Sequence, residues 1–146
     1  MLFRSDDVRS VALYPTSDRV AACTFKTLYV CDTATQQLIT SGNFSRCHDV
    51  AVSNDSKWLA VVSLRTISLY DASTLDRIWS HNRWSSFISF SPDSSQLVSA
   101  IYGKASLIDV PTGNVLKSFK HEGVERAVFS HDGTRLLSGE SSSVAL

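Results

Sequence analysis

The fold is decided by one stretch in the second half of the chain, Ile88-Ser89-Phe90-Ser91-Pro92-Asp93-Ser94-Ser95-Gln96-Leu97-Val98-Ser99-Ala100. An apolar run, a polar turn and a second apolar run follow one another in it, which is the pattern of a β-hairpin. The same pattern returns at residues 11–23, 50–62 and 127–139. The equivalent turn residues lie 39, 38 and 39 residues apart, and they are Pro15, Asn54, Pro92 and His131. A fixed period of this length indicates a repeat architecture.

Each repeat divides into short segments rich in Val, Ile, Leu, Phe and Tyr, separated by clusters of Gly, Asn, Asp, Ser and Pro. These compositions are typical of strands and turns, and no segment carries the 3.6-residue apolar stripe of a helix. We therefore predict an all-β fold built from blades of four antiparallel strands. The predicted strands cover residues 8–14, 19–24, 28–32 and 37–41; 46–53, 58–63, 67–71 and 76–80; 85–91, 97–101, 105–109 and 114–119; and 124–130, 135–139 and 143–146.

The repeats are expected to form a single domain over residues 1–146, with boundaries at about 4–43, 44–82, 83–123 and 124–146. The Asp that ends each third strand would next occur beyond Leu146, so the fourth repeat is expected to be truncated. A blade buries its faces against neighbouring blades, and a closed ring takes roughly four to eight of them. About three and a half blades therefore predict an incomplete ring, as part of a longer protein or as one half of an assembly.

The chain carries 14 basic and 14 acidic residues, so its formal net charge is zero. This balance removes the bulk attraction to nucleic acid and to anionic membranes. No apolar run approaches the ~20 residues of a membrane span, and none of signal-peptide length follows Met1. The odd number of cysteines, Cys23, Cys31 and Cys47, favours reduced thiols. We therefore expect a cytoplasmic protein without nucleic-acid or membrane partners.

The repeats resemble those of the WD-repeat (tryptophan-aspartate repeat) β-propeller family. The segments 91–93 and 130–133 match the turn between its first two strands, and Tyr70-Asp71 and Ile108-Asp109 occupy its Trp-Asp position. The resemblance implies structural roles, in holding blades together, for His81, Ser99, Asp71, Asp109 and Ser138. It also implies a fold that commonly presents interaction surfaces.

The repeats also depart from the family pattern. None of the three tryptophans, Trp58, Trp79 and Trp84, lies in the Trp-Asp position, and the turns between second and third strands lack the family's Asp. The hydrogen-bonded Trp, Ser, His and Asp tetrad of the family is therefore complete in no repeat. We expect the blades to be held together mainly by apolar packing between sheets, with Trp58 and Trp79 in the core.

The sequence offers little catalytic chemistry. It has no Gly-x-Ser-x-Gly elbow, no phosphate-binding glycine loop and no Cys-x-x-Cys pair. Cys47, His48 and Asp49 are adjacent on a predicted strand, where neighbours point to opposite faces and cannot form a triad. Cys23 and Cys31 are expected near each other across a hairpin, but with Cys47 and His48 they have irregular spacing for zinc. We expect no enzyme activity, cofactor or metal.

The charges sort between the two ends of the blades. The basic end contains two kinds of loop, those that join second to third strands and those that join a fourth strand to the next blade. Its cations and aromatic residues are Lys26, Arg46, Arg65, Arg83, Lys104, Lys120, Arg126, Phe44, Trp84 and Tyr102. The opposite, acidic end contains Asp18, Asp32, Asp55, Asp71, Asp76, Asp93, Asp109 and Asp132. Asp is a favoured turn residue, so turn chemistry alone is an alternative explanation of the acidic end.

Arg, Trp and Tyr are the residues that binding hot spots favour. We therefore expect a non-catalytic protein-interaction scaffold that binds a protein or acidic peptide through Lys26, Arg46, Arg65, Arg83, Trp84, Tyr102, Lys104 and Arg126. Two alternatives stay open. One is a structural half-propeller that completes a ring by homodimerisation or with another subunit. The other is a fragment of a propeller enzyme whose catalytic residues lie outside this chain.

Overall fold

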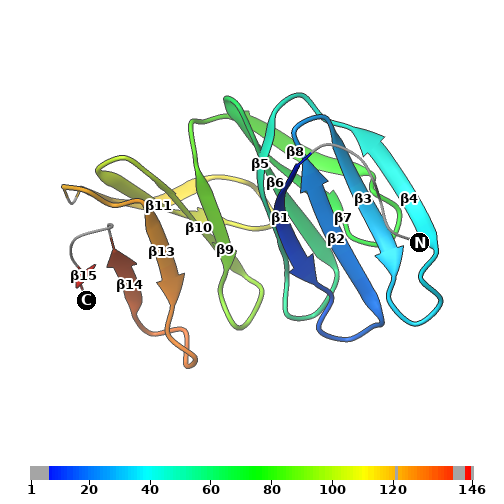
Figure 1. Ribbon diagram of the computed structural model, residues 1–146. Coiled ribbons are helices and arrows are strands. Elements are labelled where there is room, and N and C mark those ends of the chain that lie inside the picture. The colour runs from blue at the N-terminus through cyan, green and yellow to red at the C-terminus, as the bar shows by residue number, and fades with distance from the viewer. Residues whose placement is uncertain (1–6, 121, 140–143, 146) are drawn as a thin grey trace.

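A computed structural model describes residues 7–120, 122–139 and 144–145 (Figure 1). These residues form three four-stranded antiparallel sheets and one three-stranded antiparallel sheet. The sheets follow one another side by side as blades, with β1 to β4 at one end of the row and β13 to β15 at the other (Figure 1). This arrangement confirms the predicted all-β, blade-based fold. No helix in the described residues is long and apolar enough to cross a membrane.

Each blade follows the chain order of its strands. Blade 1 contains β1 (Val8–Leu13), β2 (Arg19–Thr24), β3 (Thr27–Asp32) and β4 (Leu38–Asn43). Blade 2 contains β5 (Cys47–Val52), β6 (Trp58–Ser63), β7 (Thr66–Asp71) and β8 (Arg77–Asn82). Blade 3 contains β9 (Phe87–Phe90), β10 (Gln96–Ile101), β11 (Lys104–Asp109) and β12 (Val115–Lys120). Blade 4 contains β13 (Arg126–Phe129), β14 (Leu136–Gly139) and β15 (Val144–Ala145).

All predicted strands are present, but two kinds of boundary differ. The fourth strands of blades 1 and 2 end two residues later than predicted, at Asn43 and Asn82, because both pair as far as the first residue of the third strand. Strand β9 starts at Phe87 and not at Ser85, whose hydroxyl instead bonds the carbonyl of Ala100.

The apolar core lies between the blades. One buried cluster joins blades 1 and 2 and includes Leu28, Val50 and Leu59. A second cluster joins blades 2 and 3, with Ile67 and Ile88 among its members. A third joins blades 3 and 4, and the half-buried Trp58 and Trp79 pack against the second cluster. Packing between sheets therefore holds the blades together, as the sequence predicts.

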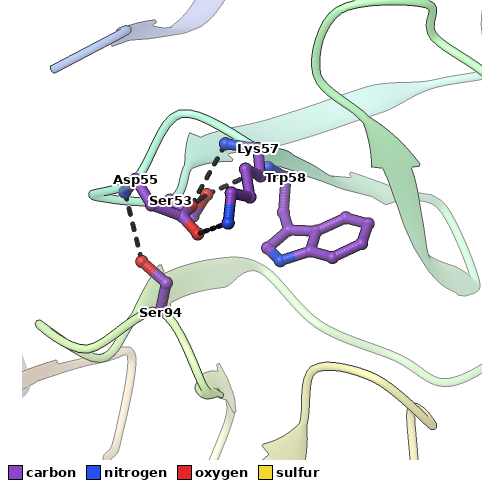
Figure 2. Close-up of polar contacts among 5 residues, drawn as sticks. All are labelled: Ser53, Asp55, Lys57, Trp58 and Ser94. Carbon is purple, nitrogen blue, oxygen red and sulfur yellow. Dashed lines mark hydrogen bonds and ion pairs between the residues drawn. The ribbon is translucent and has the colours of Figure 1, made fainter. Parts of the chain in front are cut away.

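The turns of the acidic end are built by Ser and Asp side chains. In blade 2 the Ser53 hydroxyl donates to Asp55 Oδ1 at 2.6 Å and accepts from Trp58 N at 2.9 Å (Figure 2). Asp55 N in turn donates to the hydroxyl of Ser94, in the equivalent turn of blade 3, at 3.3 Å. The same Ser-to-Asp bond recurs at residues 91–93 and 130–132. Turn chemistry therefore accounts for these Asp residues at the acidic end.

The expected closeness of Cys23 and Cys31 is wrong. The two-residue turn after β2 aligns Cys23 with Leu28, which leaves Cys31 opposite Val20 at the far end of the same strand pair. The Cys23 thiol is instead hydrogen-bonded to the thiol of Cys47, in the next blade, and both residues are fully buried. This bond and the burial raise the pKa of Cys47 far above that of a free thiol.

The alternation predicted around His48 is present, since Cys47 is buried and His48 is exposed. All three cysteines are free and buried. Within the described residues, no three His, Cys, Asp or Glu side chains converge.

Candidate functional site at the basic end

The fold places all eight predicted binding residues at one end of the blades. Antiparallel strands alternate in direction, so turns between second and third strands lie beside loops that lead to the next blade. The turns provide Lys26, Arg65 and Tyr102, the interblade loops provide Arg46, Arg83 and Trp84, and Lys104 and Arg126 begin β11 and β13. Lys120, the further cation assigned to this end, closes β12.

Aromatic rings hold three of these cations. The guanidinium carbon of Arg65 lies 4.9 Å from the centre of the Trp84 ring. Arg46 lies 5.9 Å from the Phe25 ring and Arg126 lies 5.5 Å from the Phe87 ring. Such contacts are worth about 0.5–1 kcal/mol at exposed sites and leave the charge un-neutralised. Within the part of the chain that the structure describes, these guanidinium groups are held by aromatic rings and form no ion pair with a carboxylate.

The ion pair found among the described residues lies at the other end of the blades. It joins Lys57 Nζ to Asp55 Oδ2 at 3.8 Å, within the turn of Figure 2. Among the described residues, the cations of the basic end therefore take part in no ion pair.

Two depressions flank Trp84. The first, called here the aromatic hollow, has a volume of about 460 Å³ and is lined by His48, Leu64, Trp84, Ser85, Ser86, Phe87, Ile101, Tyr102, Glu125 and Arg126. Its two large rim residues are open to solvent, since Trp84 is 56% exposed and Tyr102 is 83% exposed. Exposed aromatic residues beside a cation are a composition that protein interfaces favour.

The second depression, called here the interblade groove, has a volume of about 530 Å³ and is lined by Arg83, Trp84, Ser99, Ile101, Lys104, Ser106, Val115 and Ser118. It brings together three of the predicted binding residues, Arg83, Trp84 and Lys104. Three serines of β10, β11 and β12 share the groove with them, and the hydroxyl oxygens of Ser106 and Ser118 are 3.2 Å apart.

The predicted set is not one contiguous patch. Lys26 lines a separate depression with Phe25, on blade 1, and neither Lys26 nor Arg46 lines the aromatic hollow or the interblade groove. Arg65 lines neither of these two depressions, but it contacts the Trp84 ring and its carbonyl accepts a hydrogen bond from Arg83 N at 2.8 Å. The region with the most complete lining therefore lies on blades 2, 3 and 4.

Sequence reasoning missed Asp49, which links three blades. Its Oδ1 accepts a hydrogen bond from the Ser10 hydroxyl at 2.6 Å, and its Oδ2 accepts one from Ile88 N at 2.9 Å. Ile88 lies on an edge strand, whose outward N–H has no partner in its own sheet. Only the alignment of repeats could have suggested this role, because Ser10, Asp49 and Phe87 occupy equivalent first-strand positions.

The residues with implied structural roles lie at blade interfaces and turns. The His81 ring stacks 5.3 Å from the Trp79 ring, and its Nε2 lies 3.5 Å from the Thr112 carbonyl oxygen of blade 3. Asp71 and Asp109 accept hydrogen bonds from their own turns, from Thr74 N and Thr112 N respectively. Ser138 lies on β14 opposite Ala127, and Ser99 lines the interblade groove.

Comparisons with known proteins support the fold alone. No family model matches the chain, and no curated protein matches it. Among solved structures, hydrazine synthase of Kuenenia stuttgartiensis is similar, with a TM-score of 0.82 and 18% sequence identity. The similarity covers 96% of this chain and 45% of that chain, so this chain spans less than half the length of that structure.

Proposed function

We propose that this chain is a non-catalytic interaction scaffold of the WD-repeat type, which binds a protein or acidic peptide at the basic end. The observation that carries the proposal is the group of guanidinium ions stacked on aromatic rings, which have no carboxylate partner among the described residues. A net charge of zero favours a local, protein-directed site over nucleic acid or a membrane. The free, buried cysteines fit a cytoplasmic location, where thiols stay reduced.

The proposed mechanism is binding to a surface that is already ordered. Short turns on packed sheets hold Arg65 and Trp84 in place, so little conformational entropy is lost when a partner docks. A carboxylate of the partner accepts charge-assisted hydrogen bonds from the guanidinium groups. The exposed faces of Trp84 and Tyr102 supply the apolar contact area that anchors the complex.

The test compares charge reversal at the two ends of the blades. A peptide array of acidic and neutral sequences is probed with the wild type, with Arg65→Glu and with Lys57→Glu as the control at the acidic end. We expect the wild type and Lys57→Glu to retain acidic peptides, and Arg65→Glu to retain them at least tenfold less with an unchanged melting temperature. Equal retention by Arg65→Glu and the wild type would contradict the proposed function.

A second candidate function is completion of a ring by self-association. Val11, on the open face of blade 1, is 62% exposed, whereas its equivalents Val50, Ile88 and Ala127 are 4%, 3% and 1% exposed under the preceding blade. At the other end of the row, Leu137 is 37% exposed. The open face of blade 1 therefore resembles the face that blades 2, 3 and 4 turn to the preceding blade, and the open face of blade 4 resembles the face that a blade turns to the next one. Sedimentation should show a dimer that Val11→Asp dissociates, and a monomeric wild type refutes this candidate.

A further inference from the structure

The interblade groove has a register-equivalent counterpart between blades 1 and 2. The counterpart is lined by Ser68 and Ser80, at the positions that Ser106 and Ser118 occupy in the interblade groove. In both places the paired serines lie within hydrogen-bond distance, at 2.8 Å and 3.2 Å. The repeat has therefore built the same groove twice, and the differences between the two copies show what each is suited to.

The counterpart groove is occupied by aromatic side chains. The Phe44 ring packs edge-on against the Tyr70 ring, with 5.5 Å between ring centres. Val61 pairs with Ser68 on the neighbouring strand and is 1% exposed. The two packed rings take up part of the counterpart groove, whose lining also includes the polar side chains of Asn43, Ser45, Ser63, Arg65, Thr66, Ser68, Arg77 and Ser80.

In the interblade groove, two equivalent positions become polar and two become apolar. Arg83 takes the place of Phe44, since the backbone N of each donates to the equivalent turn carbonyl, at 2.8 Å and 2.7 Å. Ser99 stands where Val61 stands, whereas Ile108 stands where Tyr70 stands and Val115 where Arg77 stands. The guanidinium group of the interblade groove therefore lies in the loop before blade 3, and a hydroxyl group lies on its second strand.

Ser99 is the decisive residue of the interblade groove. It is only 6% exposed, it lines the groove, and its hydroxyl makes no hydrogen bond within the described residues. No buried side-chain oxygen or nitrogen of the described residues lacks a hydrogen-bond partner, so the unbonded Ser99 hydroxyl is open to the groove and can donate to a ligand there. The cations at the rim, Arg83 and Lys104, have no carboxylate within 4 Å in the described part of the chain. All strong polar groups that line the groove are therefore hydrogen-bond donors or can become donors.

We propose that the interblade groove binds an anionic oxygen group, a phosphate monoester or a carboxylate, carried by the peptide partner. Ser99 donates from the floor of the groove, Ser106 and Ser118 donate from its wall, and Arg83 and Lys104 neutralise the charge at its rim. Trp84 stands beside the groove and covers the neighbouring peptide residue. This inference rests on the proposed function, and it names the group that the basic end recognises.

The test uses capped peptides that differ only in one central residue, which is phosphoserine, glutamate or serine. Each is titrated into the ¹⁵N-labelled protein, and a sodium chloride titration of matched ionic strength serves as control. We expect saturable shifts of the Ser99, Lys104 and Ser106 amides with one or both anionic peptides, and none with serine or with salt. The amides of Ser68 and Ser80 report the counterpart groove and should not move.

Ser99→Val and Arg83→Phe introduce into the interblade groove the residues that the counterpart positions carry. The double variant should bind the anionic peptide at least tenfold more weakly. Arg77→Ala, which removes a cation that lines the counterpart groove, is the matched control and should bind like the wild type. Shifts that also follow sodium chloride, or a double variant that binds like the wild type, overturn the inference. The phosphoserine and glutamate arms identify the anion source.

The two proposals fail separately. If Arg65→Glu abolishes acidic-peptide retention on the array while no anionic peptide shifts the groove amides, the scaffold function stands and the groove inference is wrong. If the groove binds phosphoserine while array retention is unaffected by Arg65→Glu, the groove inference stands and the proposed role of Arg65 is wrong.

Discussion

Substitution of Gly113 by alanine tests how tightly blade 2 packs against blade 3. Gly113 is buried in the turn after β11 and has a φ of +71°. A Cβ atom at this position would lie 2.5 Å from His81 Nε2 and 2.8 Å from Trp79 Cδ2. Trp79 also donates a 2.7 Å hydrogen bond from Nε1 to the Val110 carbonyl of blade 3. Both β8 side chains must therefore move to admit a single methyl group.

The expected loss of stability for Gly113→Ala is about 3–5 kcal/mol. The positive φ accounts for about 1 kcal/mol, as for any non-glycine residue in this region. Overpacking adds about 1–3 kcal/mol, and a broken Trp79 hydrogen bond adds about 1 kcal/mol. Gly133→Ala is the matched control, because Gly133 has the same φ of +71° but the nearest atom to its new Cβ would be Pro92 Cδ, at 3.5 Å.

The assay is urea denaturation of the wild type and both variants, followed by tryptophan fluorescence and circular dichroism. Gly133→Ala should lose about 1 kcal/mol, so the difference between the variants isolates the contact with Trp79 and His81. Domains of this size have a stability of about 5–15 kcal/mol, so both variants should remain folded. Variants that agree within about 0.5 kcal/mol would refute the proposed close packing.

Two further predictions concern carboxylates. Asp49→Ala should lose about 3 kcal/mol in the same assay, because it leaves the buried Ile88 N–H unpaired and removes charge-assisted bonds, whereas the exposed Asp18→Ala should change stability by less than about 0.5 kcal/mol. Equal effects would contradict the linking role of Asp49. Hydrogen bonds from Ser130 and Thr134 lower the pKa of Asp132 to about 2, so its contribution is present above about pH 4 and is lost as the pH falls toward 2. The stability advantage of the wild type over Asp132→Asn should fall in that range, and an advantage that is constant with pH would contradict it.

The strands and the two ends of the blades could be predicted from sequence because both depend on local pattern. Apolar runs of strand length, separated by Asp, Ser and Gly turns, specify each hairpin without reference to its neighbours. The positions of Arg65 and Trp84 at one end follow directly from the antiparallel order. Where the prediction depended on register within a hairpin, as for Cys23 and Cys31, it was wrong, since a two-residue turn fixes which residues face each other.

Contacts between blades could not be predicted in the same way. The bond from Ser10 to Asp49 joins residues 39 positions apart, and the bond from Trp79 to Val110 joins residues 31 positions apart. Neither pair has a local signal, because each depends on how two sheets are rotated against each other. The cation–π contacts of the arginines at the basic end have no local signal either, because each aromatic partner comes from a different loop or strand.

The most informative sequence signal is where the repeat fails to repeat. The second-strand position shared by Ala22, Val61, Ser99 and Ser138 is apolar in blades 1 and 2 and a serine in blades 3 and 4. In blade 3 that serine coincides with a second exchange, since Arg83 lines the interblade groove where Phe44 lines its counterpart. No buried side-chain oxygen or nitrogen of the described residues is unpaired, so the unbonded Ser99 hydroxyl is open to the interblade groove. A ligand in this groove can accept hydrogen bonds from Ser99 and Arg83 together, which is why we expect recognition between blades 2 and 3.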